Sequence, residues 1–244
     1  MKILTVFLTI FTTAIFINSC NVTKTNSEIV VYSDNKEQNS GPLTIILNKG
    51  KSFNHPTYVI WMEDECGKYI KTLFITKSYA SGIFGHQMVG DSVWLKTSGT
   101  SYQPAALPYW TFRKGLINGK SYIPDPDNPY VDAFTGATPK SDFRFDTYAG
   151  ENSKDYRILM EVNQSWDWNE FWTNNKYPES PAYKHSAQPS VIYEVTVNNE
   201  NTEFYLNPIG HGDPKGETGT LYSNLGTLTS AKEIFSSVKV EIKK

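Results

Sequence analysis

Short apolar runs separated by polar turns recur along the chain and predict β-strands. They are rich in β-branched and aromatic residues, which favour strands, and several alternate between apolar and polar positions. The expected strands cover residues 29–32, 43–47, 58–63, 69–75, 143–147, 156–162, 190–197, 204–206 and 238–242. The two runs around Gly67 predict a hairpin with Cys66 at its tip, and residues 143–147 and 156–162 predict a second strand pair.

Helical signals are few. Ser230 and Glu233 have the spacing of a capping box, which predicts a short helix near the C-terminus. Residues 109–114 allow another small helix, within a Gly-, Pro- and aromatic-rich region from 79 to 132 that predicts long loops. No long helices alternate with the strands, so we expect an antiparallel β-sandwich and no parallel α/β sheet.

The N-terminus has the pattern of an export signal. Lys2 precedes an apolar stretch from residue 3 to 17, which has the length of a signal-peptide core and is too short to span a bilayer. The following Asn18-Ser19-Cys20 resembles the lipobox of bacterial lipoproteins. The resemblance implies cleavage before Cys20 and a diacylglycerol on its sulfur, which anchors the chain to a membrane.

These features divide the chain into a signal peptide at residues 1–19, a lipidated Cys20 with a polar tether at 20–41, and one β-sandwich domain at 42–244. Asn21 follows the cysteine where an Asp would mark retention in the inner membrane. We therefore expect an extracytoplasmic protein on the outer membrane.

The composition excludes some classes of partner and of stabilising cross-link. The formal net charge is −2 and no basic stripe occurs, so nucleic acid is not an expected partner. Cys66 is the only cysteine besides Cys20, so the domain has no disulfide framework and depends on an apolar core.

The four histidines do not have the spacing of a metal site; they are His55, His86, His185 and His211. His55 precedes a proline and is expected to end a turn, and His211 lies between two glycines in an expected solvated turn.

Two further segments admit two interpretations each. Residues 125–129 alternate Asp and Asn with Pro and could resemble a calcium loop, but the prolines favour a rigid turn. Residues 166–172 contain three Trp and one Phe, which could form a stacking surface or cap the core, and core packing is favoured.

The segment from Asp132 to Thr138 resembles the flavinylation motif Asp-x-x-(Ser/Thr)-Gly-Ala-Thr, with Thr135, Gly136 and Ala137 at its other fixed positions. The resemblance implies that a periplasmic flavin transferase attaches FMN to the Thr138 hydroxyl through a phosphoester. Small residues before the acceptor let the loop enter the transferase, which must supply the base and metal because a hydroxyl is a weak nucleophile. Asp132 and Thr135 are expected to hold the loop by side-chain to backbone hydrogen bonds. The alternative is a structural turn without flavin.

A wider resemblance covers most of residues 42–244. The chain is similar to predicted periplasmic proteins called domain of unknown function 2271. The resemblance is carried by residues 58–73, 109–114, 131–139, 156–161, 188–193, 210–212 and 228–234. It implies an immunoglobulin-like β-sandwich and genes near flavin transferases and membrane redox proteins, without an established biochemical role.

Two functions from different classes follow. The first is a non-enzymatic envelope lipoprotein whose sandwich binds or positions partners, with a periplasmic flavin transferase or an envelope redox protein as candidates. The second is an electron carrier with covalent FMN on Thr138. No catalytic triad, nucleophile elbow or phosphate loop occurs in the sequence, so a conventional enzyme is the least expected class.

Overall fold

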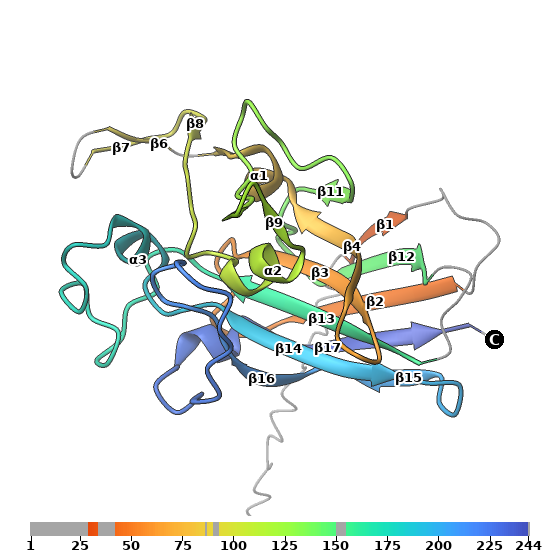
Figure 1. Cartoon of the computed structure of the whole chain (residues 1–244). Coiled ribbons are helices and arrows are strands. Elements are labelled where there is room, and N and C mark those ends of the chain that lie inside the picture. The colour runs from red at the N-terminus through yellow and green to blue at the C-terminus, as the bar shows by residue number, and fades with distance from the viewer. Residues whose placement is uncertain (1–28, 34–41, 86, 90–92, 150–154, 244) are drawn as a thin grey trace, which may run out of the picture.

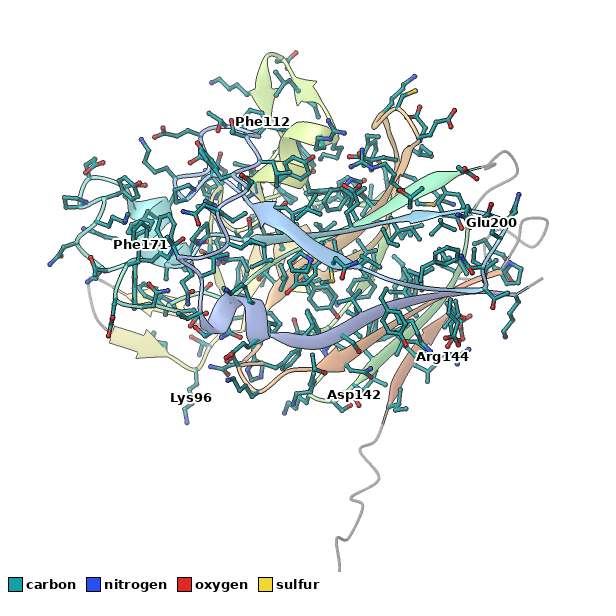
Figure 2. The ribbon with its side chains drawn as sticks, turned by 90° about the horizontal axis from the view of Figure 1, so that it is seen from below. Lys96, Phe112, Asp142, Arg144, Phe171 and Glu200 are labelled. Atoms are coloured by element: carbon teal, nitrogen blue, oxygen red, sulfur yellow. The ribbon has the colours of Figure 1, made fainter. Side chains whose placement is uncertain are left out.

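The computed structural model describes residues 29–33, 42–85, 87–89, 93–149 and 155–243. Two large sheets stack face to face, as Figures 1 and 2 show from two sides. The first sheet has the order β1 (Val30–Ser33), β12 (Phe143–Tyr148), β2 (Pro42–Lys49), β17 (Phe235–Ile242) and β15 (Glu203–Tyr205). The second has the order β11 (Phe134–Gly136), β4 (Tyr69–Thr76), β3 (Thr57–Asp64), β13 (Tyr156–Asn163), β14 (Val191–Val197) and β16 (Asn207–His211). The expected mostly-β sandwich is confirmed.

Small elements cover the second sheet and the ends of the strands. The helical ones are α1 (Lys77–Ser81), α2 (Pro108–Arg113), α3 (Pro181–Ser186) and one 3-10 turn (Ser230–Glu233). Three two-stranded ribbons pair β5 (Ile83–Phe84) with β8 (Gly99–Thr100), β6 (Gln87–Val89) with β7 (Val93–Leu95), and β9 (Leu116–Ile117) with β10 (Lys120–Ser121). Within the part of the chain that the structure describes, no helix has the length and hydropathy needed to cross a bilayer.

The second sheet is buried on both faces. Its inner face packs on the first sheet around a large apolar core that includes Ile45, Phe74, Phe145 and Met160. Its outer face carries a second cluster with α1, α2 and the loops between them. This explains why β3 is almost continuously apolar rather than alternating, with all but its last residue buried. The outer layer therefore places α1, α2 and the loop residues next to them on the sheet (Figure 1).

Each sheet adds one parallel strand at the same side of the sandwich. The central pairings are antiparallel, whereas β1 pairs in parallel with β12 and β11 pairs in parallel with β4. The short strand expected at residues 29–32 is confirmed as β1, so the sheet already begins at Val30, within the segment expected to be a tether.

Two local expectations are wrong. Strands β12 and β13 do not pair with each other, because β12 lies in the first sheet and β13 in the second. The capping box is not formed either, since Ser230 Oγ donates to Asp167 Oδ1 and accepts from Gln188 Nε2. Glu233 instead pairs with Lys51. The short C-terminal helix is present, as a single 3-10 turn.

The expected hairpin and the small second helix are confirmed. Strands β3 and β4 pair in antiparallel register, and the exposed Cys66 lies in the turn between them. The helix expected at residues 109–114 is α2, which begins with Pro108 at its first position, where proline is well tolerated. Cys20 and the signal peptide lie outside the described residues, as does His86.

Candidate functional site

The segment that resembles the flavinylation motif forms the edge of the second sheet. Its centre is β11, whose residues Phe134, Thr135 and Gly136 pair with Phe74, Ile75 and Thr76 of β4. The sequence favoured a loop here, because three residues around a glycine give too weak a strand signal. Backbone pairing to β4 fixes the position of the segment relative to the sandwich.

Gly136 allows this strand to lie close to the aromatic core. A Cβ atom at this position would lie 2.9 Å from Cε2 of Phe74 and 3.3 Å from Cε2 of Tyr32. Distances below 3.0 Å are essentially never observed for a real Cβ, and the nearest atom belongs to a packed ring. Phe134 anchors the same strand, with its ring centroid 5.5 Å from that of Tyr32 and 5.1 Å from that of Phe145.

The remaining motif side chains face outward. Asp132, Thr135 and Ala137 are exposed, whereas Thr138 is half-buried and Pro139 is buried. The Thr138 hydroxyl donates to the carbonyl oxygen of Pro56 at 3.2 Å, just before β3. The motif thus presents Thr135 on β11, while the exposed Asp132 and Ala137 and the half-buried Thr138 lie in the segments on either side of the strand.

The expected role of Asp132 and Thr135 is not what the structure shows. Among the described residues, neither side chain makes a hydrogen bond that would hold the loop. The β11–β4 pairing and the Phe134 ring supply the order that these hydrogen bonds were expected to supply.

A lysine enclosed by three aromatic rings lies near the start of the motif. Lys114 Nζ lies 4.7 Å from the ring centroid of Trp110, 3.9 Å from that of Tyr122 and 4.6 Å from that of Tyr130. Such ring faces attract a cation. Burial lowers the pKa of Lys114 to about 8, and the negative charge of Asp132 acts in the opposite direction.

A threonine connects this aromatic group to the sheet. Thr72 Oγ1 on β4 accepts from Trp110 Nε1 at 2.9 Å, and it lies within hydrogen-bond distance of the hydroxyls of Tyr69 and Tyr130. Thr72 thereby binds the polar atoms of Trp110 and Tyr130, which fixes two of the three rings around Lys114.

A buried carboxylate caps the beginning of α2. Glu161 on β13 accepts from the backbone N–H of Trp110 at 2.7 Å, from that of Tyr109 at 3.2 Å and from Ser190 Oγ at 2.5 Å. Burial raises the pKa of Glu161 to about 7, although these hydrogen bonds act in the opposite direction. Glu161 caps the N-terminus of α2 from the neighbouring strand, because Leu107 at the N-cap position has no side-chain oxygen that could accept these hydrogen bonds.

A second buried carboxylate holds the other end of α2. Glu63 is fully buried and binds Arg113 through two hydrogen bonds of 2.8 Å, while Oε1 also accepts from Trp61 Nε1 at 3.0 Å. Arg157 lies 3.3 Å from Glu63 Oε2 and also pairs with Glu194. The oxygens of Glu63 are thus occupied by structural partners.

The histidines do not converge. Among the described residues no group of three His, Cys, Asp or Glu side chains could hold a metal ion. His55 is exposed in a turn, as expected. His211 is buried, contrary to the expected solvated turn, because its ring stacks on Tyr222 at 5.2 Å and packs edge-on against Trp172.

The segment at residues 125–129 is a rigid turn. The Asp125 carboxylate accepts from the backbone N–H groups of Asp127 and Asn128, at 2.9 and 2.8 Å. The expected turn is therefore formed, with Asp125 Oδ1 bound to the backbone of its own turn.

The aromatic segment at residues 166–172 divides between core and surface. Trp172 is buried and Trp168 packs against the main core, whereas Trp166 and Phe171 are exposed. Lys176 covers the Phe171 ring, with Nζ 3.3 Å from the centroid. Core packing accounts for only half of these rings.

The helix α2 was expected from the sequence, but the charged residues that hold it were not; they are Glu63, Arg113 and Glu161. The sequence of β13 contained a signal for Glu161, because a charged residue within a largely apolar strand requires a buried partner. Comparisons of the chain with protein-family models, curated proteins and solved structures gave no significant match.

Proposed function

We propose that this chain is a lipoprotein of the bacterial cell envelope, held by a lipid on Cys20. Its β-sandwich serves as a non-enzymatic binding or scaffold module of an extracytoplasmic flavin or redox system. The observation that carries the proposal is the exposure of Thr135 on the edge strand β11, together with the exposed Asp132 and Ala137 in the segments on either side of this strand. A transferase or redox partner that reads this motif needs access to these side chains.

The occupied carboxylates support a non-enzymatic role. Glu63 and Glu161 are the charged groups that the fold buries most completely, and each accepts hydrogen bonds from fixed structural donors. A carboxylate that acts in acid–base catalysis must be able to reach a substrate atom. Here both groups instead position α2 on the second sheet.

A second candidate function is covalent flavin carriage, with FMN on Thr138. It is supported by the position of Thr138, which directly follows the exposed Ala137 and is only half-buried, with its hydroxyl donating to the Pro56 carbonyl. In the reaction the Thr138 oxygen attacks the FMN phosphorus of FAD, the bond to AMP breaks, and the hydroxyl proton passes to the transferase base. The products are the FMN phosphoester of Thr138 and AMP, so no oxidant or reductant is consumed.

Co-expression with a flavin transferase tests both functions. The mature domain is denatured, separated on a gel and examined for flavin fluorescence and for the mass of one added FMN. Covalent carriage predicts both signals in the wild type and in Thr196→Ala, an exposed threonine of β14, but not in Thr138→Ala.

The scaffold function predicts a different result. The wild type stays dark beside a modified control substrate, yet the immobilised domain retains the transferase, and Thr135→Ala combined with Asp132→Ala abolishes this binding. If the wild type shows no labelling and no motif-dependent binding, both proposed functions of this edge are contradicted.

A further inference from the structure

The tether from Cys20 joins the sandwich beside the segment that follows Thr138. The backbone N–H of Val30, at the start of β1, donates to the carbonyl oxygen of Asp142 at 3.0 Å. Asp142 is four residues after Thr138. Even a fully extended chain places their Cα atoms no more than about 14 Å apart.

The two parallel edge strands also touch each other across the sandwich. Tyr32 of β1 has its ring centroid 5.5 Å from that of Phe134 of β11 and 6.3 Å from that of Phe74 of β4. One region, which we call the tether edge, is therefore formed by the start of β1, residues 137–142, and residues 49–51 at and just after the end of β2. Lys49 belongs to it because its Nζ donates to the carbonyl oxygen of Lys140 at 2.7 Å.

The chain between the lipid and the tether edge is short. Nine residues separate Cys20 from Val30, which allows a reach of about 35 Å at most. A domain of this size has a radius of gyration of about 17 Å, which for a compact sphere corresponds to a diameter of about 43 Å, more than this reach. A lipid on Cys20 therefore keeps the tether edge within about 35 Å of the bilayer, whereas the opposite side of the domain can lie farther away.

Exposed lysines surround the tether edge. Lys49, Lys51 and Lys140 belong to it, and Lys77 directly follows Thr76, which pairs with Gly136. The acidic groups here are the half-buried Asp142, which accepts from the backbone N–H of Lys49, and Glu233, which pairs with Lys51. Lysines in this arrangement are attracted to the headgroups of anionic lipids.

We propose that the tether edge rests against the anionic lipid surface in which Cys20 is anchored, so that Thr138 lies in the zone next to the bilayer. The proposal rests on the lipid anchor of the proposed function. A protein that reads or modifies the motif is then itself associated with the membrane. The β3–β4 hairpin lies on the opposite side of the molecule from Asp142 (Figure 2).

Energy transfer to the membrane tests this orientation, and the protein supplies its own distant probe. The lipidated mature chain is bound to vesicles of phosphatidylethanolamine and phosphatidylglycerol that carry an acceptor dye on the headgroups. One sample is labelled on the native, exposed Cys66, and the other on Lys140→Cys in a Cys66→Ser background. The proposal predicts several-fold larger transfer from position 140 than from position 66.

A charge-reversal variant tests the contact itself. In the sample labelled at position 140, Lys51→Glu with Lys77→Glu is expected to lower the transfer, and phosphatidylcholine vesicles are expected to do the same. The matched control reverses two exposed lysines outside the tether edge, Lys68→Glu with Lys120→Glu, and leaves the transfer unchanged.

The outcomes separate the two proposals. Equal or larger transfer from Cys66, with the chain floating on the vesicles, overturns the orientation and leaves the lipid anchor intact. Transfer that is insensitive to Lys51, Lys77 and lipid charge overturns the electrostatic contact. A chain that does not float, or whose Cys20 carries no lipid, overturns the anchor and the orientation together.

Discussion

A Cβ atom added to Gly136 would lie 2.9 Å from Cε2 of Phe74, at the point where β11 joins the edge of the second sheet. Gly136→Ala must therefore displace the Phe74 ring or detach the strand. We expect a loss of about 1–3 kcal/mol in the free energy of unfolding, measured by urea denaturation. Ala137→Ser, at the exposed neighbouring position, should leave stability unchanged; equal effects of the two substitutions would contradict the close packing of β11.

Glu161 makes stability depend on pH. Its pKa is raised to about 7 in the folded protein from an ordinary value of 4.5, so between these values the folded state binds more protons than the unfolded state. Stability is therefore expected to fall as pH rises from about 4.5 to about 7, by up to about 3 kcal/mol. Glu161→Gln should remove this part of the slope in urea denaturation at several pH values. A variant with the slope of the wild type would assign the dependence to other groups.

Two opposed effects act on the charge of Lys114 among the rings of Trp110, Tyr122 and Tyr130. The ring faces attract the cation, whereas burial disfavours it and lowers its pKa to about 8. Because the net shift is downward, Lys114→Met, which keeps the length of the side chain and removes the charge, is expected to raise the free energy of unfolding at pH 7 by about 1–2 kcal/mol in urea denaturation. Lys120→Met, at an exposed position of β10, serves as control and should change stability by less than about 0.5 kcal/mol. A loss of stability in Lys114→Met would show that the attraction of the ring faces outweighs burial.

Among the charged residues, substitution of Glu63 should cause the largest loss of folding stability. Glu63→Gln leaves Arg113 and Arg157 without their shared carboxylate beneath α2. Removing one partner of a buried ion pair costs about 3–5 kcal/mol, and we expect the lower end because both arginines are partly exposed. Glu194→Gln affects Arg157 alone and should cost clearly less. If the two variants are equally stable, the Glu63 network does not hold α2 in place.

The fold could be predicted from the sequence where strong strand signals coincide with local contacts. The β3–β4 hairpin and β14 were predicted because period-two or continuous apolar runs flank recognisable turns. The pairing of β12 with β13 was predicted wrongly, since neighbours in sequence here belong to different sheets. Both strands are apolar toward the same core, so the hydrophobic pattern does not distinguish the two arrangements.

The site was predicted only in part for a related reason. The motif residues from Asp132 to Thr138 were identified, but the strand that presents them depends on β4 and on the aromatic rings of distant segments. Ser230 and Glu233 have the sequence of a capping box, yet Asp167, Gln188 and Lys51 compete successfully for their polar atoms. The spacing of residues along the sequence does not reveal partners that come from distant segments.

The central claim is that a lipid on Cys20 delivers this sandwich to the cell envelope. Mass spectrometry of the N-terminal peptide of the protein, isolated from bacterial membranes, tests it most directly. We expect a mature chain that begins at Cys20 and carries diacylglycerol on its sulfur. A chain that begins at any other residue, or an unmodified Cys20 thiol, would contradict it.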